Sequence, residues 1–271
     1  MKLLAQSACL LLIVAALAWP ALAQEPAAPR WKILAEGLEF AKLDAGGAAR
    51  VGSDLISILR VDPQRYRFTV LATANEDDEW TAGQWRAQSG ALAVFNAGQY
   101  AEDHSYLGFL AQDGQILGRM VGHLEALFLA EPNDPALPPA RILDLRYTAF
   151  DPRANPYRQA AQSLMLLDRF GQIRVRRSPR VAHRTAVAAD ARGRILVIVT
   201  EGAHTLWELA QFLAGAGLDL REVMLMDGGG ESQIDVKVGD FRYQQYGGPS
   251  STPDLPWPRQ ALPVALAVFP R

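Results

Sequence analysis

Cysteine is almost absent from this sequence of 271 residues, in which Cys9 is the only one. Cys9 lies inside a short apolar stretch near the N-terminus, so the rest of the chain contains none. A chain without cysteine cannot form disulfides, use a thiolate nucleophile or bind a metal through sulfur. We therefore expect its stability to come from a hydrophobic core.

A strong charge of either sign is also missing, because the formal net charge is −2 and the calculated pI is about 6.1. This balance provides no basic surface for nucleic acid. After the N-terminal stretch, no apolar run reaches the length that a membrane-spanning helix needs. We expect neither a nucleic-acid partner nor a membrane span in the mature chain.

The first 23 residues have the three parts of a secretory signal peptide. Lys2 supplies the positive charge, residues 10–18 are apolar, and Ala21-Leu22-Ala23 has the small-residue pattern of a cleavage site. Cleavage after Ala23 predicts a periplasmic or secreted protein, and an uncleaved anchor is the alternative. A flexible leader (24–30) and one folded domain (31–271) are then expected to follow.

Most of the remaining chain consists of short apolar segments between turn signals, which is typical of β-strands. The expected strands are 31–40, 53–61, 67–71, 91–95, 108–111, 115–117, 164–167, 185–189, 195–200, 223–226, 234–238 and 262–269. Residues 81–88 suggest a short helix. The clearest helix begins at Thr205, which forms a capping box with Glu208, and ends near Gly217. Proline-rich loops are expected at 131–140 and 250–259.

This pattern predicts an α+β fold, a single domain on a mixed, mostly antiparallel β-sheet core with a few helices. A division into two domains near residues 131–160 is the alternative. The chain has no repeat at a fixed period.

The strongest chemical signal is the segment Met226-Asp227-Gly228-Gly229-Gly230-Glu231-Ser232, which follows an apolar strand. Three glycines allow a sharp turn and close approach of a ligand to the backbone, whose N–H groups can form an anion-binding nest. Glu231 adds a second carboxylate and Ser232 a hydroxyl. The plainer interpretation is a tight turn that begins at Asp227.

A second strand ends in Phe95-Asn96-Ala97-Gly98-Gln99-Tyr100, followed by Glu102, Asp103 and His104. The amide of Asn96 both donates and accepts hydrogen bonds, which suits a sugar hydroxyl. The alternative is an asparagine in a left-handed turn beside Gly98. For Glu102, Asp103 and His104 the alternative is a solvated loop.

Two further strands carry charged residues at their ends. Arg184, in His183-Arg184-Thr185-Ala186, can bind phosphate through two parallel hydrogen bonds, although most such arginines are solvated or salt-bridged. His183 is a candidate proton donor, or an ordinary surface histidine. Glu201 follows strand 195–200, with an ordinary turn as the alternative. Strand ends with carboxylates, one arginine and one amide are typical of a carbohydrate or phosphoester pocket.

The ordered set Phe95-Asn96-Ala97-Gly98, Arg184-Thr185-Ala186 and Asp227-Gly228-Gly229-Gly230-x-Ser232 resembles the phosphodiester glycosidase family, to which the lysosomal uncovering enzyme belongs. The resemblance spans roughly residues 85–240 and includes the helix 205–216 and the segment 162–167. The chain departs from the family pattern at Ala97-Gly98-Gln99-Tyr100, where Gly-Gly-Phe-Phe is usual, and at Glu231, where serine is commoner. It also lacks a proline at Leu164 or Met165. These departures are closer to a small bacterial branch and bear on the sugar specificity.

The resemblance implies hydrolysis of a sugar 1-phosphodiester to a free sugar and a phosphomonoester. Under this hypothesis Arg184 binds the phosphate with help from the 228–230 backbone, and Asp227 or Glu231 activates water or stabilises positive charge at the anomeric carbon. Glu102 or His104 assists the leaving group, and Asn96 orients a sugar hydroxyl. The catalytic candidates are Asp227, Glu231 and Glu102. The substrate-binding candidates are Asn96, Gly98, His104, Arg184, Thr185, Glu201, Gly228, Gly229, Gly230 and Ser232.

The sequence requires no cofactor, although Asp227 could hold a calcium or magnesium ion. Retention and inversion both remain open. Two other classes of function remain as well. One is a non-catalytic module of the cell envelope that binds a carbohydrate phosphodiester. The other is a purely structural protein, in which Asn96, Arg184 and Asp227 would not converge.

Overall fold

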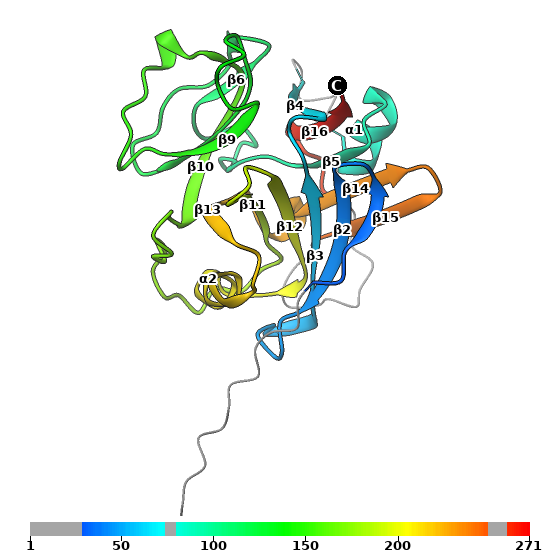
Figure 1. Ribbon diagram of the computed structural model, residues 1–271. Helices are drawn as coiled ribbons and strands as arrows, with labels where there is room; N and C mark the ends of the chain where they lie inside the picture. Colours follow the sequence, from blue (N-terminus) through cyan, green and yellow to red (C-terminus); the bar gives the residue numbers. More distant parts are fainter. Residues whose placement is uncertain (1–28, 74–79, 249–258) are drawn as a thin grey trace, which may run out of the picture.

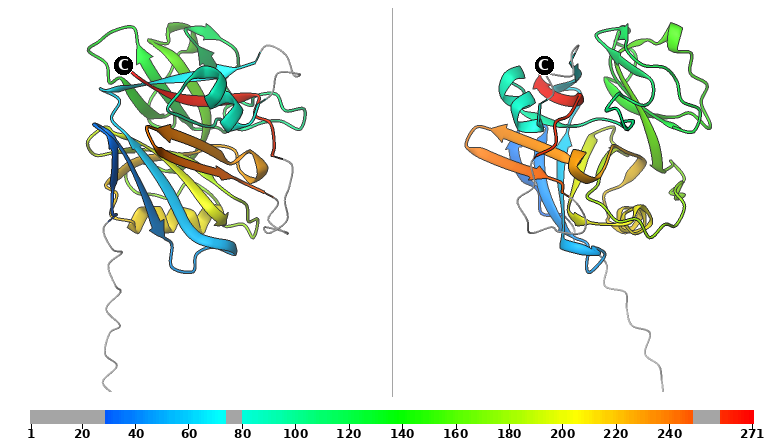
Figure 2. Two further views of the ribbon diagram at one scale, coloured as in Figure 1. Left: turned by 90° about the vertical axis from the view of Figure 1, so that its right-hand side faces the viewer. Right: turned by 180° about the vertical axis from the view of Figure 1, so that it is seen from behind.

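The computed structural model describes residues 29–73, 80–248 and 259–271. The expected signal peptide, most of the leader and most of the loop 250–259 lie outside these residues. Two β-sheets pack face to face, and one helix lies on the outer side of each (Figures 1 and 2). The pairings between the named strands are all antiparallel, so the expected α+β fold on a mostly antiparallel core is confirmed.

The larger sheet has eleven strands. In spatial order its main path is β1 (Lys32–Ala35), β2 (Leu38–Asp44), β3 (Val51–Val61), β12 (Ile195–Ala203), β11 (Thr185–Asp190), β13 (Leu220–Leu225), β10 (Tyr157–Leu167), β6 (Leu110–Gln112) and β7 (Gln115–Ile116). Off this path, β8 (Ala126–Pro132) pairs with β10 and with β9 (Ala140–Asp144). The expected strand 31–40 is in fact a hairpin, because Gly37 takes a positive φ of 76° and turns the chain.

The smaller sheet has five strands. Their order is β15 (Phe241–Tyr246), β14 (Gln233–Val238), β5 (Ala93–Asn96), β16 (Val264–Pro270) and β4 (Tyr66–Ala72). Helix α1 (Ala82–Ser89) covers its outer face through Trp85, which packs with residues of β5 and β16.

Helix α2 (Leu206–Gly215) covers the outer face of the larger sheet through Leu209, Ala210 and Leu213. The hydroxyl of Thr205 caps it, accepting from the backbone N–H of Glu208 at 3.1 Å. The Glu208 carboxylate accepts from that same hydroxyl, so the expected return bond to the backbone is replaced by a side-chain bond. No helix among the described residues is long and apolar enough to cross a membrane.

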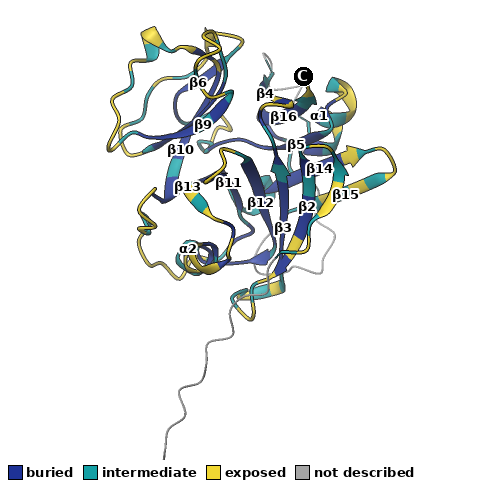
Figure 3. Cartoon of the chain, in the orientation of Figure 1, coloured by how far each residue is buried: buried dark blue, intermediate teal, exposed yellow. Residues whose placement is uncertain are grey.

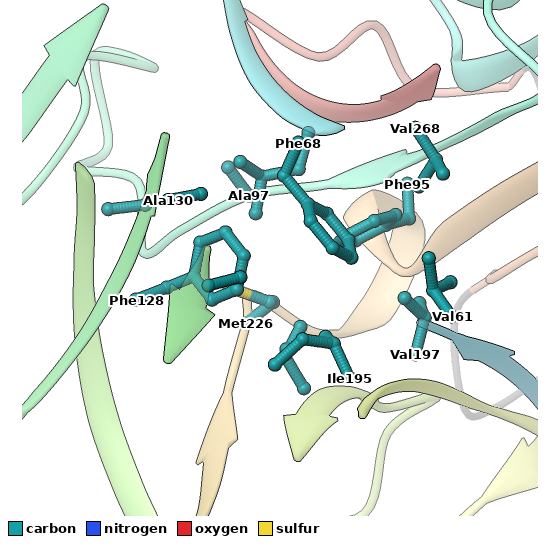
Figure 4. Close-up of a cluster of buried hydrophobic side chains, with 14 of the residues drawn as sticks. Val61, Phe68, Phe95, Ala97, Phe128, Ala130, Ile195, Val197, Met226 and Val268 are labelled. Carbon is teal, nitrogen blue, oxygen red and sulfur yellow. The ribbon is translucent and has the colours of Figure 1, made fainter. Parts of the chain in front are cut away.

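The main core lies between the two sheets, and period-two alternation builds it. On β12, Ile195 and Val197 face the smaller sheet, whereas Leu196 and Ile198 face α2. Because these central strands are buried on both faces, they are apolar almost throughout (Figure 3). Phe95 and Met226, which precede the two polar motifs, both belong to this core (Figure 4).

Strands β6 to β9 form a lobe beside the two sheets (Figure 1). Residues 157–163 of β10 pair with β8 in this lobe, and residues 164–167 continue into the larger sheet beside β13. One uninterrupted strand thus joins both parts, and the lobe extends the same sheet. The expected loop 131–140 is shorter, because β8 runs to Pro132 and β9 begins at Ala140.

Candidate functional site

The Asp227 motif is the connection that carries the chain from β13 in the larger sheet to β14 in the smaller one. The N–H of Asp227 donates to the carbonyl of Ala97, just beyond β5, at 3.3 Å. Two residues later, the N–H of Gly229 donates to the carbonyl of His183, just before β11, at 3.0 Å. All three sequence motifs therefore meet where the two sheets adjoin.

The Asp227 carboxylate is held by backbone groups. Oδ2 accepts from the N–H of Tyr100 at 3.0 Å, and Oδ1 accepts from the N–H of Gly228 at 2.8 Å. Burial raises the pKa of Asp227, while these two hydrogen bonds and the charges of Arg180 and Arg184 act in the opposite direction. Each oxygen keeps a lone pair for another partner.

The side chain of Asn96 lies inside the protein and does not face a ligand cavity, contrary to the expectation from the sequence. Its side chain is fully buried, its Nδ2 donates to the carbonyl of Asp227 at 2.9 Å, and its Oδ1 accepts from the N–H of Gln233 at 3.1 Å. The amide is thus occupied inside the protein and is not available to a sugar hydroxyl. It fixes both ends of the connection that carries Asp227.

Thr185 and Ser232 are also internal. Both are fully buried, and their hydroxyl oxygens lie 2.9 Å apart in a hydrogen bond that joins β11 to the start of β14. Neither lines a cavity described below. These motif residues therefore hold the two sheets together and do not contact a ligand in this arrangement.

The structure accounts for the glycine run mainly by the lack of room for side chains there, and less by an anion-binding nest. The N–H groups of Gly228 and Gly229 are already bonded to Asp227 and to His183. A Cβ on Gly228 would lie 2.7 Å from the carbonyl oxygen of His183, and one on Gly230 would lie 2.5 Å from Oε1 of Gln260. A side chain at Gly228 would push the connection away from the backbone before β11, whereas one at Gly230 would displace the side chain of Gln260.

Two other glycines have positive φ angles. Gly229 has a φ of 76° and Gly98 a φ of 82°, in the region where L side chains are strained. At Gly98 a Cβ would also lie 3.3 Å from the ring of Tyr100. Gly98 thus turns the chain after β5, so that the N–H of Tyr100 reaches Asp227.

Two cavities meet at Asp227. The first, here the carboxylate cavity, has a volume of about 160 Å³. Its lining is Tyr100, Ala101, Glu102, His104, Asp227, Glu231, Ala261 and Pro263. Burial raises the pKa of Glu231, and the charge of Asp227 raises it further. Three expected site carboxylates, those of Glu102, Asp227 and Glu231, therefore face one space together with His104.

The second, here the arginine cavity, has a volume of about 210 Å³. Its lining includes Arg180, Arg184, Asp227, Gly228 and Gly229. Arg184 Nε donates to the carbonyl of His204 and Nη2 to the carbonyl of Arg180, both at 3.1 Å. Burial lowers the Arg184 pKa to about 10, so its guanidinium is still charged at neutral pH. It forms no ion pair within the described part of the chain.

A family model for phosphodiester glycosidases matches residues 89–269. The chain belongs to the phosphodiester glycosidase family. No curated protein gives a significant match to the sequence. The three motifs lie inside the matched range.

Solved structures show that the fold is shared. The zebrafish N-acetylglucosamine-1-phosphodiester alpha-N-acetylglucosaminidase catalytic domain, auto-inhibited by its pro-peptide, has a TM-score of 0.58 at 16% identity, over 80% of this chain and 77% of that one. A hypothetical protein from Synechocystis also has a TM-score of 0.58, at 14% identity, over 90% and 64%. A putative exported protein from Burkholderia pseudomallei K96243 has a TM-score of 0.51 at 13% identity, over 82% and 76%.

Glu201 lies outside the site formed by the two cavities at Asp227. Its carboxylate pairs with Lys42 and accepts from Ser57 Oγ and the Tyr243 hydroxyl, both at 3.0 Å. It lines neither cavity at Asp227, so the expected substrate contact is not present. The reason is that β12 continues to Ala203, with an irregular register at this point, and does not end at Thr200.

His183 is buried and is not a surface residue. Burial, aided by the charges of His204 and Arg184, lowers its pKa to about 4. It is therefore neutral near pH 7 and a poor proton donor there. Its Nδ1 lies 3.4 Å from the N–H of Gly248, as an acceptor.

Three residues that form or support the site were not among the expected site residues. Arg180 lines the arginine cavity, Tyr100 holds Asp227 through its backbone, and Gln233 holds Asn96. Only Arg180 had a sequence signal, since it ends a run with four arginines in residues 174–180. No group of three or more metal-ligating side chains (His, Cys, Asp or Glu) occurs among the described residues.

Proposed function

We propose that this protein hydrolyses sugar 1-phosphodiesters, releasing a free sugar and a phosphomonoester. One observation carries the proposal: Asp227 lines both cavities, with carboxylates on one side and arginines on the other. A sugar 1-phosphodiester matches this arrangement, because its hydroxyl groups can donate to carboxylates and its negatively charged phosphate can bind arginines. The name of the zebrafish relative describes a bond of this class.

Arg184 is the proposed phosphate-binding residue. Two of its nitrogens are fixed by backbone carbonyls, while Nη1 has no acceptor among the described residues. That nitrogen would lie 3.2 Å from a Cβ on Gly228, so it is beside the Asp227 connection. A guanidinium held by neutral groups retains its full charge for an anionic ligand. Arg180, exposed at the same cavity, adds a second charge.

The two partly buried carboxyl groups have distinct proposed roles. Burial raises the pKa of both groups, but two backbone N–H bonds oppose this rise at Asp227, whereas the charge of Asp227 adds to it at Glu231. We assign the proton of the pair to Glu231 on the basis of this difference in hydrogen bonding. Asp227 then stabilises positive charge at the anomeric carbon, and Glu231 protonates the departing phosphate oxygen. Water adds to the anomeric carbon as the bond from that carbon to the phosphate oxygen breaks, and the proton that this water loses returns to the Glu231 carboxylate.

Glu102 and His104 line the same small cavity and are proposed to bind sugar hydroxyls. A cavity of about 160 Å³ suits a single sugar ring. The departures from the family pattern at Gln99-Tyr100 and at Glu231 lie at this cavity or beside it. We therefore assign the choice of sugar to this part of the site.

We propose that no metal ion takes part. Both oxygens of Asp227 already accept N–H bonds, and in the arginine cavity Arg180 and Arg184 would repel a cation on that side of the carboxylate. Dialysis against a chelator should leave turnover unchanged. Loss of turnover that calcium or magnesium restores would show that Asp227 belongs to a metal site.

We further propose that the protein acts outside the cytoplasm, on envelope or extracellular glycans. The pattern of residues 1–23 supports this, as does the similarity to the Burkholderia protein described as a putative exported protein. The mature protein, recovered from a bacterial host that expresses the full chain, should begin at Gln24 by mass spectrometry. A retained N-terminus would instead support the uncleaved anchor.

The test of the activity uses residues 24–271 and an aryl phosphodiester of a sugar 1-phosphate, with release of free sugar as the readout. Asp227→Asn should lower kcat by about 10²–10⁴-fold, the usual range for such a group. Glu201→Gln is the matched control, because this carboxylate lies outside both cavities. Unchanged turnover in Asp227→Asn would remove Asp227 from the mechanism. Wild-type binding without turnover would favour the non-catalytic binding module.

A further inference from the structure

A third cavity lies next to the arginine cavity and is larger, with a volume of about 750 Å³. Here called the outer cavity, it is lined by Arg50, Arg177, Ser178, Pro179, Val181, Thr205, Trp207, Glu208 and Gln211. Ser178 lines both the outer cavity and the arginine cavity. The carboxylate, arginine and outer cavities therefore adjoin one another in turn, with Asp227 shared by the first two and Ser178 by the last two.

The walls of the outer cavity suit a sugar. Trp207, in the first turn of α2, is partly exposed, and the guanidinium of Arg177 lies 4.6 Å from its ring centroid. This cation–π contact fixes an aromatic ring beside a positive charge. The helix packs on the sheet through Leu209, Ala210 and Leu213, so Trp207 is not needed for that contact.

The segment that forms the shared wall carries an excess of positive charge. Arg174 is neutralised by Glu125, Asp144 and Asp168. By contrast, Arg176, Arg177, Arg180 and Arg184 form no ion pair with an acid in the described ranges. Arg50 is paired with Glu208, so it adds no net charge. Four unpaired arginines within nine residues of a chain of net charge −2 create a local positive field that attracts anions.

We infer that the outer cavity binds the leaving-group side of the substrate, and that the substrate is an anionic oligosaccharide with a further charged group beyond the scissile phosphodiester. This assignment rests on the proposed function. The sugar next to the scissile phosphate stacks on Trp207, and the second anionic group contacts Arg177. The volume of the outer cavity supports this assignment. At about 750 Å³ it is larger than a single phosphate group would fill, and it lies in the usual range for a ligand with more than one ring.

The experiment compares two substrates with the same sugar and the same scissile bond. One carries a methyl group on the phosphate, and the other carries a disaccharide phosphate. The wild-type protein should cleave the longer one with a kcat/KM at least tenfold higher, and added salt should reduce this advantage because charge contributes to it. Arg177→Gln and Trp207→Leu should each reduce the advantage to below threefold by raising KM, with the methyl substrate unaffected.

The control is Arg192→Gln, an exposed arginine in the turn at the far end of β11. An equal kcat/KM for the two wild-type substrates, or variants that slow both equally, would overturn the inference while the proposed function stands. A larger advantage for a nucleoside phosphate leaving group would overturn the assignment to a glycan.

A binding measurement separates the two proposals if neither substrate is cleaved. Calorimetric titration of the wild-type protein with the disaccharide phosphodiester then decides the role of the outer cavity. Binding at least tenfold weaker in Arg177→Gln and Trp207→Leu would support it although the proposed function had failed. Equal binding by wild type and both variants would overturn it.

Discussion

The backbone N–H of Tyr100 donates a 3.0 Å hydrogen bond to Oδ2 of Asp227. Tyr100 follows β5 of the smaller sheet, and Asp227 follows β13 of the larger one, so this bond joins the two sheets at the site. The orientation of the carboxylate thus depends on the backbone between Asn96 and Tyr100. Residues that never touch a substrate are expected to control catalysis through it.

Asn96→Ala tests this dependence. The substitution leaves the N–H of Gln233 without its acceptor and the carbonyl of Asp227 without its donor, which should lower the free energy of unfolding by about 1–3 kcal/mol. Because Asp227 then loses its position, kcat should fall at least tenfold while KM changes little. Urea denaturation and steady-state kinetics measure the two effects.

Asn155→Ala is the matched control for Asn96. The Asn155 amide also bonds backbone groups, those of Tyr157, but it lies in the lobe. It should lower stability without lowering kcat. Equal losses of kcat in the two variants would show that Asn96 acts only through general stability.

Gly228→Ala tests the need for space at the Asp227 connection. The new Cβ would lie 2.7 Å from the backbone oxygen of His183, which cannot move freely, so we expect a loss of about 1–3 kcal/mol in unfolding free energy and a loss of turnover. Gly215→Ala is the control and should raise the unfolding free energy. It ends α2, has nothing within 4 Å, and should stabilise the protein by about 0.5–1 kcal/mol. A neutral Gly228→Ala variant would contradict the proposed role of this glycine.

Much of the fold could be predicted because the alternation of apolar and polar residues that marks a strand can be seen within a single short segment. Strands such as β11 and β12 alternate between two cores, and the structure has strands at both of the expected segments. Strands β8, β9 and β15 could not be identified with equal ease. Strand β15 has exposed and partly exposed residues throughout, and β8 and β9 flank a proline-rich loop.

The roles of the motif residues depend on partners that are distant in the sequence. The acceptor on Asn96 is used by Gln233, 137 positions away, so a buried amide could not be told from one that faces a ligand. Glu201 looked like a strand-end carboxylate, but β12 runs two residues past it and turns it toward Lys42. For Asp227 the local pattern of strand and glycines left an ordinary turn open, and the structure places its carboxylate at two cavities.

A double-mutant cycle on Thr185 and Ser232 tests the link between β11 and β14. Thr185→Val alone should cost about 1–3 kcal/mol, because it leaves the buried hydroxyl of Ser232 unpaired. Ser232→Ala alone should cost a similar amount for the same reason. The double variant should be more stable than the sum of the single losses predicts, because it contains neither of the two hydroxyls and so leaves no buried hydroxyl unpaired. Strictly additive losses in thermal denaturation would show that the hydroxyls do not interact.

Glu231→Gln separates the chemical role of Glu231 from its effect on stability. Burial and the charge of Asp227 raise its pKa above the ordinary value of 4.5, so the folded chain holds this proton at pH values where the unfolded chain has released it. The ionisation of Glu231 therefore costs folding stability, and this cost grows as the pH rises from about 4.5 through the raised pKa. Glutamine removes the cost, so the variant should unfold at a higher temperature than wild type at pH 8, with the difference lost near pH 4.

The same variant should be catalytically impaired. Glutamine cannot donate the proton assigned to Glu231, so kcat should fall by about 10²–10⁴-fold, and the decline of activity at high pH should disappear from the profile. Asp240→Asn, an exposed carboxylate in the β14–β15 turn, is the control and should change neither property. A Glu231→Gln variant with the wild-type pH profile would exclude Glu231 as the acid and leave Glu102 or His104, in the same cavity, to supply the proton.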